Sequence, residues 1–299
     1  ARRPGRTVPA MRWLLALFVI CAALPARATT ELKIATWNVA WFTLRPAGDR
    51  DLPRDLTMRN EADFARLRAY AARLAADIVA LQEVDGPEAA ARLLDSREYE
   101  FHFPDERDVQ RAGFAWRRGL QVTRNPDLAG LDLRPHARFS LRRGADITLE
   151  VPGGSRLRML SVHLNAGCME GPLDAPRREC DSLGQQASVL AGWIAERRRD
   201  GIPFMILGDF NRRIAHGDAF LSVLEQHGPV LRANEGVSNP CWAGDRGGRP
   251  FIDHILLGGA ARGWMVEGSL RVLLYAERDP ALRERISDHC PLSLRMRLP

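Results

Sequence analysis

Lysine is almost absent from this sequence of 299 residues, because Lys33 is its only lysine. Arginine therefore supplies nearly all of the 43 basic side chains, and genome composition explains such a bias as well as ligand recognition does. Low-complexity linkers are absent too, and nothing in the composition indicates a second domain. A chain of this length is long enough to bury one large core.

No apolar run in the sequence is long enough to cross a bilayer, since Trp13–Leu24 has twelve residues and a spanning helix needs about 20. Met11-Arg12 gives this run a basic start, and the small-residue site Ala26-Arg27-Ala28 follows it, a pattern typical of a secretory signal peptide. We therefore expect residues 1–28 to be removed. Residues 29–299 are expected to form a single periplasmic or secreted domain without a transmembrane span. An uncleaved membrane anchor is the alternative, and it would need a longer apolar run.

The formal net charge of +6 comes almost entirely from the expected signal peptide. Residues 1–28 hold five arginines and no acidic residue, so the remaining 271 residues would carry a net charge of +1. Overall charge therefore gives no support for strong non-specific binding to nucleic acid, although a local arginine patch remains compatible with it.

Cysteine is scarce, and the four cysteines that follow the signal segment contain no C-x-x-C pair, which makes zinc binding a weaker alternative. Four cysteines allow three pairings. Proximity in the sequence favours Cys168–Cys180, which leaves Cys241–Cys290, and export would permit both disulfides. Four reduced thiols are the other alternative.

What the chain does contain is a series of apolar runs that each end in polar residues. The plainest is Ile202–Arg213, where an apolar run typical of a strand buried on both faces is followed at once by Gly208, Asp209 and Asn211. Asp209 and Asn211 lie two residues apart, so both can reach a pocket beyond the end of the strand. Taken alone, these residues would equally suit an Asx turn that closes a core strand.

The same design recurs in five further segments. Apolar runs lead to Asn38, to Gln82 with Glu83 and to His163, whereas Asp253 and His254 lie within the run Phe251–Leu257. Asp288 and His289 precede one last short strand. Burying so many polar groups without partners would be costly, so we expect them to converge on one solvated cleft that holds a metal ion. His254 follows Asp253 in a strand and therefore points to the opposite face, where we expect a structural role.

Hydrophobic periodicity and turn residues predict the remaining elements. Helices are expected at Asn60–Ala75, Pro87–Leu94, Gln185–Arg199 and Ala219–Gln226. Strands are expected at Leu32–Asn38, Ile78–Glu83, Tyr99–Phe103, Gly113–Trp116, Leu120–Thr123, Ile147–Val151, Arg158–Asn165 and Phe251–Leu257, with a hairpin turn at Pro152–Gly154. Strands and helices in this order suit two packed sheets flanked by helices.

Six polar motifs, taken in order, carry a resemblance to a known family. They are W-N at 37–38, Q-E at 82–83, S-V-H-L at 161–164, G-D-F-N at 208–211, I-D-H-I at 252–255 and S-D-H at 287–289. This set resembles the endonuclease/exonuclease/phosphatase superfamily of DNase I-like and exonuclease III-like enzymes, inositol polyphosphate 5-phosphatases and bacterial sphingomyelinases. The resemblance implies an α/β fold, a four-layer α/β/β/α sandwich of two mostly antiparallel sheets flanked by helices.

The resemblance also implies a metal site. Glu83 would be the main ligand, with Asn38 beside it and Asp288 binding a metal directly or through water. Oxygen ligands of this kind favour hard ions, so we expect Mg²⁺ or Mn²⁺, with Ca²⁺ as a further option.

Catalytic roles follow from the same resemblance. Asp253 would orient His289 and raise its pKa, so that the pair transfers a proton or stabilises charge in the transition state. Asp209 keeps a claim to be the general base. His163 would donate to a phosphate oxygen, and Asn211 would orient the scissile phosphate.

We therefore expect a monomeric, exported, metal-dependent phosphodiesterase that hydrolyses phosphoesters by direct attack of water, with DNA or RNA as the first substrate. The nearest rival is a phosphatase, or a hydrolase of the phospholipase C or sphingomyelinase type. A third hypothesis is a non-catalytic binding module on the same fold, which the complete set of polar motifs disfavours.

Overall fold

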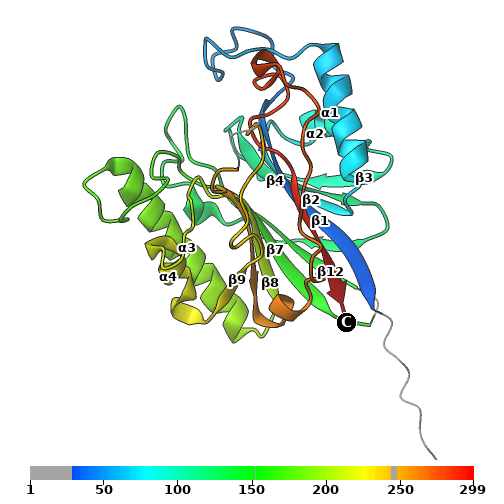
Figure 1. Ribbon diagram of the computed structural model, residues 1–299. Coiled ribbons are helices and arrows are strands. Elements are labelled where there is room, and N and C mark those ends of the chain that lie inside the picture. Colours follow the sequence, from blue (N-terminus) through cyan, green and yellow to red (C-terminus); the bar gives the residue numbers. More distant parts are fainter. Residues whose placement is uncertain (1–28, 152, 244–247) are drawn as a thin grey trace, which may run out of the picture.

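The computed structural model describes residues 29–151, 153–243 and 248–299. The signal peptide expected at residues 1–28, and Pro152 of the expected hairpin turn, lie outside the described residues. The described chain forms two six-stranded sheets packed face to face, with helices on both outer sides (Figure 1). The predicted four-layer α/β/β/α sandwich is confirmed.

The first sheet has the strand order β11-β12-β1-β2-β4-β3. Its centre is a parallel pair, β1 (Thr30–Phe42) and β2 (Ile78–Val84), joined by helix α1 (Glu61–Leu74). The other strands pair antiparallel, and helix α2 (Pro87–Leu93) packs near α1. They are β3 (Tyr99–His102), β4 (Arg111–Arg117), β11 (Arg271–Val272) and β12 (Leu292–Leu298).

The second sheet has the order β5-β6-β7-β8-β10-β9 and repeats this plan. Its parallel pair is β7 (Arg156–His163) and β8 (Phe204–Asp209), joined by helix α3 (Arg178–Arg199). Helix α4 (Ala219–Leu224) packs beside α3. The remaining strands, all antiparallel to their neighbours, are β5 (Gln121–Arg124), β6 (Ala145–Glu150), β9 (Val230–Arg232) and β10 (Asp253–Gly258).

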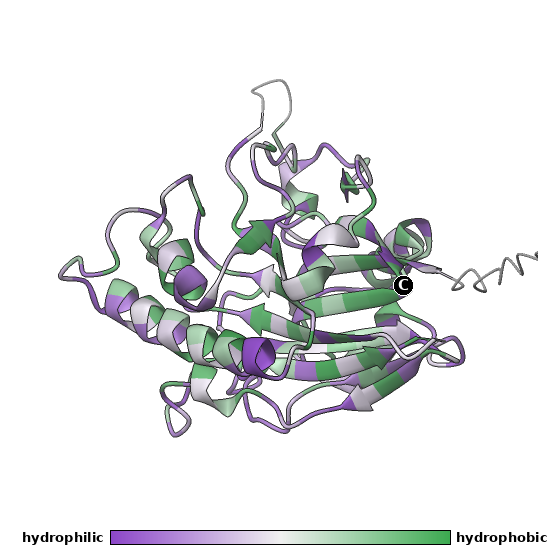
Figure 2. Ribbon diagram, turned by 90° about the horizontal axis from the view of Figure 1, so that it is seen from below, coloured by the Kyte–Doolittle hydropathy of each residue, from purple (hydrophilic) through white to green (hydrophobic). Residues whose placement is uncertain are grey.

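Three apolar clusters hold the layers together. One lies between the sheets, and each of the others lies between a sheet and its helices. Strand β8 shows how one sequence serves two clusters, because Met205 and Leu207 face the other sheet while Phe204 and Ile206 face α3. Figure 2 shows the corresponding concentration of hydrophobic residues on the strands inside the sandwich. The strand predicted to be buried on both faces is therefore confirmed.

The helices begin where local chemistry favours it. At the start of α1, Asn60 and Asp63 form a reciprocal capping box, within the predicted range. Helix α3 begins at Arg178 instead of the predicted Gln185, because Glu179 and Asp181 suit the positive end of the helix and Cys180 is buried against the core. None of the described helices is long and apolar enough to cross a bilayer.

The pairing of the strands determines where the polar motifs meet. Parallel strands end at the same edge of a sheet, and His163 at the end of β7 is directly opposite Asp209 at the end of β8. Asp253 begins β10, which runs antiparallel to β8, and it also lies opposite Asp209. In the first sheet, Asn38 on β1 pairs with Gln82 on β2, next to Glu83.

Candidate active site

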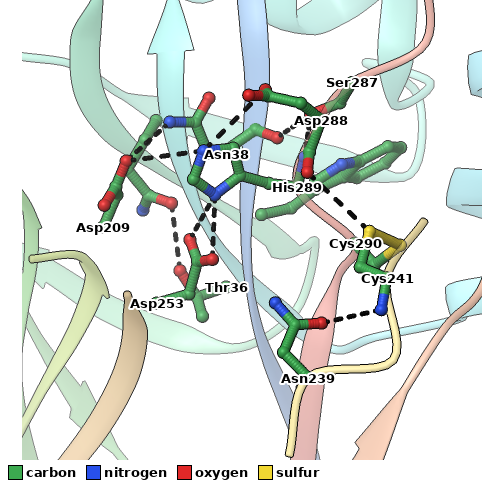
Figure 3. Close-up of polar contacts among 12 residues, drawn as sticks. Thr36, Asn38, Asp209, Asn239, Cys241, Asp253, Ser287, Asp288, His289 and Cys290 are labelled. Carbon is green, nitrogen blue, oxygen red and sulfur yellow. Dashed lines mark hydrogen bonds and ion pairs between the residues drawn. A yellow bond between two sulfur atoms is a disulfide. The ribbon is translucent and has the colours of Figure 1, made fainter. Parts of the chain in front are cut away.

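His289 lies between two carboxylates, with a hydrogen bond to Asp253 and an ion pair to Asp209 (Figure 3). Nδ1 of His289 lies 2.8 Å and 3.0 Å from the two carboxylate oxygens of Asp253. The other ring nitrogen, Nε2, points toward Asp209 and lies 3.8 Å from its Oδ2. This arrangement fixes the orientation of the imidazole and directs Nε2 to the centre of the site.

Backbone contacts fix the loop that carries His289. Ser287 Oγ accepts from the backbone N–H of His289 at 3.0 Å and donates to the carbonyl of Asn38 at 2.7 Å. The hydroxyl of Tyr275 donates to the carbonyl of His289 at 2.6 Å and accepts from the indole of Trp37. The His289 loop is thus attached to strand β1 on two sides.

Glu83 presents its carboxylate to the cleft from an unusual backbone position. Its φ is +59°, and the register of β2 against β4 shifts between Leu81 and Val84, as in a β-bulge. Oε1 accepts from Asn38 Nδ2, and Oε2 accepts from the N–H of Trp41 and from the side chain of Gln110. Non-glycine residues with left-handed φ values are rare, and such strain is typical of functional sites.

Asp209 and Asn211 depend on Gly208 for their position. The φ of Gly208 is +148°, and a Cβ there would lie 2.0 Å from the carbonyl oxygen of Val162 on the neighbouring strand. Only glycine permits the two strands to approach so closely. Beyond it, Asp209 Oδ1 accepts from the N–H of Asn211, and Asn211 Nδ2 donates to the carbonyl of Leu164.

His163 is buried between the two halves of the site. Its Nε2 lies 3.7 Å from Glu83 Oε1 and 3.8 Å from Asp209 Oδ2, while Nδ1 lies 3.3 Å from the carbonyl of Gln110. In the neutral ring, the Nδ1–H donates to Gln110, so Nε2 presents a lone pair to the cleft. Donation from His163 to a phosphate therefore requires the protonated ring, which a bound anion would favour.

These groups face a cleft of about 490 Å³. Glu83, His163, Asp209, Asn211, Asp288 and His289 all line it. Asn38 and Asp253 lie just behind and reach these residues by hydrogen bonds. All eight predicted site residues are thus brought together at one end of the sandwich, whereas buried His254 faces away and bonds to the carbonyl of Arg212.

Two of the expected metal ligands have particular surroundings. Asn38 turns Nδ2 toward Glu83 and Asp209, each at 3.0 Å, and its oxygen accepts from the N–H of Ala40. In this orientation Asn38 contacts the carboxylates as a donor. Asp288 lies at the rim with a side chain 48% exposed, 3.8 Å from both His289 and Arg283. Their roles as metal ligands stay predictions.

The donor atoms fit a divalent cation. Ligand atoms of Glu83, His163 and Asp209 lie within 4.8 Å of one another, as do those of Asp209, Asp253 and His289. Several carboxylate oxygens around one point suit a hard ion such as Mg²⁺ or Mn²⁺, which also retains waters and binds phosphate oxygens. Glu83 is the natural centre of such a site, because three donors already orient its carboxylate.

Burial and neighbouring charges shift the pKa values of the catalytic candidates in different directions. Burial alone would lower the pKa of His289, but the carboxylates of Asp253 and Asp209 outweigh it and raise the pKa well above 6.5. Burial raises the pKa of Asp209 to about 7, with a further contribution from Asp253 that His289 opposes. Burial, then the charge of Arg142, lowers the pKa of His163 well below 6.5. Near neutral pH the site therefore combines an imidazolium with a carboxyl group that exchanges protons readily.

Two disulfides flank the site, with the pairing favoured by sequence proximity. Cys168 pairs with Cys180, and Cys241 pairs with Cys290, which directly follows His289. The second disulfide links the loop before β10 to the loop that carries His289 (Figure 3).

Comparison with known sequences decides the family. The sequence model of the Endonuclease/Exonuclease/phosphatase family matches residues 35–289. The chain belongs to this family. It is therefore a member of a family of phosphoester hydrolases. A comparison with curated protein sequences found no significant match.

Solved structures of other family members share the fold. A structural genomics target from Bacteroides vulgatus, itself an endonuclease/exonuclease/phosphatase, is 15% identical with a TM-score of 0.55, over 90% of this chain and 100% of that one. The human nocturnin catalytic domain with bound sulfate is 15% identical with a TM-score of 0.54, over 89% and 93%. TDP2 from D. rerio, in complex with a single-strand DNA product, is 20% identical with a TM-score of 0.52, over 89% and 98%. At these identities the likeness shows the fold alone.

Several residues of this endonuclease/exonuclease/phosphatase site are not evident from the sequence. Gln110 holds Glu83 through its side chain and contacts His163 through its carbonyl. Arg59 donates to four carbonyls, those of Val39, Trp41, Arg285 and Ile286, and so joins the segment after Asn38 to the loop before His289. Arg142 is buried at the cleft wall. In the sequence, Arg59 and Arg142 are distinguished only by their charge and Gln110 only by its amide group, and neither feature identifies a site residue.

Proposed function

We propose that this protein is a divalent-metal-dependent phosphodiesterase with nucleic acid as its first substrate. The observation that carries the proposal is the line from Asp253 through His289 to Asp209, which faces Glu83 across one cleft. Such a cleft can hold a phosphate between a cationic imidazolium and a carboxylate-bound ion.

The side chains of the site supply the steps of direct hydrolysis. Asp209 would take a proton from the attacking water as the new phosphorus–oxygen bond forms, because its carboxylate lies in the cleft between His163 and His289. His289, held as imidazolium by Asp253, would bind the negative charge that develops on a phosphoryl oxygen while the bond to the leaving oxygen breaks and that oxygen takes up a proton from solvent. Asn211 and His163 would position the phosphate. Glu83, with Asp209 nearby, would hold the divalent ion, which when bound neutralises charge on the phosphoryl oxygens.

Two arginines of the cleft support a substrate that carries phosphate. Arg134 and Arg142 both line it, and among the described residues no carboxylate lies within 4.0 Å of either guanidinium, although the charge of Arg142 acts on nearby Asp108. Their charge is available to an anion, and arginine suits phosphate because its donors are arranged as a fork. TDP2, which shares the fold, has been captured with a single-strand DNA product.

Export of the protein is part of the same proposal. We infer a periplasmic or secreted location, with residues 1–28 as signal and residues 29–299 as one domain. The two disulfides support it, because such bonds persist in oxidising compartments.

A second candidate rests on a neighbouring pocket of about 580 Å³. It shares Trp41 and Asp288 with the cleft, and Asp55 and Glu284 make its lining acidic despite the presence of Arg283. An acidic pocket with an indole suits a cationic group such as a quaternary ammonium. This pocket favours a phospholipase C or sphingomyelinase activity as the alternative.

A panel of phosphoesters separates the candidates. Single-stranded DNA, duplex DNA, RNA, an inositol phosphate, sphingomyelin and a small generic diester are each incubated with Mg²⁺, Mn²⁺, Ca²⁺ or EDTA. We expect metal-dependent cleavage of nucleic acid and of the diester, loss of both in Glu83→Gln, and no change in Glu88→Gln, which alters an exposed residue of α2. Release of phosphocholine without cleavage of nucleic acid would establish the second candidate instead. If no phosphoester is cleaved under any condition, both candidate activities are wrong.

A further inference from the structure

Residues 133–143, called here the arginine loop, form one wall of the cleft just before strand β6. The loop contains Arg134, Arg138, Arg142 and Arg143 and no acidic residue, in a chain whose overall charge is otherwise nearly balanced. Arg134, Phe139 and Arg142 line the catalytic cleft, and Arg138 and Phe139 line a small pocket beside it that also contains Asp51 and Asp108. Both arginines that line the cleft itself thus come from this loop.

The loop holds an aromatic ring where a substrate would pass. Phe139 is 51% exposed, more than any other large hydrophobic residue among those described. The guanidinium of Arg138 lies 5.1 Å from the centre of its ring. Phe139 and Trp41 line the same cleft and the same small pocket. A ring that remains so exposed inside a cleft offers a flat apolar face to a bound molecule.

The arginines have unused hydrogen-bonding capacity. Arg142 is only 8% exposed, and among the described residues its one hydrogen bond is from Nη2 to the carbonyl of Leu164. Nε of Arg142 and Nε of Arg134 are both buried without a partner in the described part of the chain. Nε of Arg197, Arg198 and Arg232 also lacks a partner within the described ranges, so it is the position of Arg134 and Arg142 in the catalytic cleft that makes their donors available to an anion.

The opposite side of Trp41 has the reverse character. There Asp55 and Glu284 line the neighbouring pocket, while Asp288, which it shares with the cleft, lies 3.8 Å from Arg283. The two carboxylates of Asp55 and Glu284 would repel a chain of phosphates. A polyanion that places one phosphate at Glu83 and His289 is therefore directed along the arginine loop and away from this pocket.

We infer that the arginine loop and Trp41 form a subsite for single-stranded nucleic acid, in which a base next to the scissile phosphate stacks on Phe139 and the adjoining phosphate binds Arg134 or Arg138. This inference rests on the proposed nuclease function and specifies its substrate. Stacking on exposed aromatic rings together with arginine contacts is how proteins bind single strands. In a duplex both faces of a base are already covered by its neighbours, and a base would have to leave the stack to reach Phe139.

The test compares substrates within one variant. For wild type, Phe139→Ala and Phe139→Trp, kcat/KM is measured on a single-stranded oligonucleotide, on its blunt duplex and on methyl p-nitrophenyl phosphate, with Mn²⁺. We expect wild type to prefer the single strand to the duplex. In Phe139→Ala the ratio of kcat/KM for the oligonucleotide to that for the small diester should fall about 10-fold, and Phe139→Trp should restore it. Leu231→Ala, which removes another exposed hydrophobic side chain, on β9, is the matched control and should leave the ratio unchanged.

Salt dependence provides a second measurement. The double variant Arg134→Ala/Arg138→Ala should bind the oligonucleotide more weakly, with a less steep dependence of log Kd on log salt concentration, because fewer phosphates are neutralised. An unchanged ratio in Phe139→Ala, or a wild-type preference for the duplex, would overturn the subsite and leave the nuclease function standing. Failure of wild type to cleave any oligonucleotide in the presence of metal would overturn both.

Discussion

At the scale of single residues, a substitution in the Asp253–His289 pair distinguishes a role in catalysis from a role in metal binding. His289→Ala is expected to lower turnover about 10²–10⁴-fold, the usual contribution of a positioned acid or base. The rise in melting temperature produced by added Mn²⁺ should persist, because Glu83 is proposed to hold the ion and the imidazole of His289 contacts Asp253. Turnover on a small diester, measured beside the melting temperature with and without Mn²⁺, tests both statements.

Glu83→Gln is the matched comparison for that experiment. It weakens the anionic centre of the proposed metal site, so turnover and the metal-induced rise in melting temperature should both fall. A metal response that is lost in His289→Ala and kept in Glu83→Gln would show that the two roles are reversed.

Arg59 gives a prediction about a residue that touches no substrate. Burial lowers its pKa to about 10, so it remains charged at neutral pH while it donates to four carbonyls around the site. Arg59→Lys should lower the free energy of unfolding by roughly 1–3 kcal/mol, because one ammonium cannot satisfy all these buried acceptors, and should also lower kcat. Arg68→Ala, an exposed change on α1, is the control. Equal melting temperatures and kcat values in the two variants would contradict this role.

The contrast between Asp209 and Arg59 explains what the sequence could reveal about the site. Asp209 is predictable because it follows an apolar run, and its type and position both indicate a strand end in a cleft. Arg59 donates to backbone carbonyls, and Gln110 offers its own backbone carbonyl to His163. Every residue has a carbonyl, so no pattern of side chains predicts these contacts. Asn38 can present either its amide oxygen to a metal or its amide nitrogen to a carboxylate, depending on the orientation of the side chain. Its position in the sequence does not predict that orientation.

At the scale of elements, the two disulfides have different expected consequences. Removing Cys241–Cys290, which closes a separation of 49 residues, should cost about 4 kcal/mol in the chain-entropy account, and removing Cys168–Cys180, which closes 12, about 3 kcal/mol. Of the two disulfides, only Cys241–Cys290 is next to His289. Cys241→Ser/Cys290→Ser should therefore also lower kcat, whereas Cys168→Ser/Cys180→Ser should mainly lower the melting temperature. Thiol titration of each purified variant confirms its oxidation state, and similar kcat values in both would refute the distinction.

The helices and strands themselves were largely predictable, because amphipathic periods and apolar runs are local properties. The short edge strands β9 and β11 were not predicted, because two or three residues are too few to show a period, and the other differences lie at ends set by tertiary structure. Strand β1 continues past the predicted Asn38 to Phe42, through Ala40 and Trp41, both of which have φ of +49°. These positive φ values are imposed by the surroundings, here by the hydrogen bonds of Trp41 to Glu83 and Arg59. The residue types alanine and tryptophan do not predict them.

At the scale of the whole molecule, one buried carboxyl group should make stability depend on pH. Burial raises the pKa of Glu106 from 4.5 to about 8, and nearby Asp108 adds to the effect. The folded state therefore binds a proton that the unfolded state has already released, so stability is full below pH 4.5 and declines as the pH rises to about 8. The free energy of unfolding of Glu106→Gln, minus that of wild type, should therefore increase across this pH range by up to a few kcal/mol. At higher pH this difference should stay constant.

Melting temperatures of both proteins at intervals from pH 5 to pH 9 measure this difference. Glu88→Gln, on the surface of α2, is the control and should follow wild type at every pH. Curves for Glu106→Gln and wild type that run parallel throughout would rule out a titrating Glu106.

The position of β12 has a consequence for the protein during its synthesis. This strand lies inside the first sheet, between β11 and β1, and the residues just before it include Asp288 and His289. A growing chain that has emerged only as far as β10 already has Glu83, His163, Asp209 and Asp253, yet it has neither the imidazole that Asp253 orients nor the strand that completes β1. On the proposed mechanism, a chain that stops at β10 is therefore inactive, and hydrolysis requires the segment from Asp288 to the end of β12.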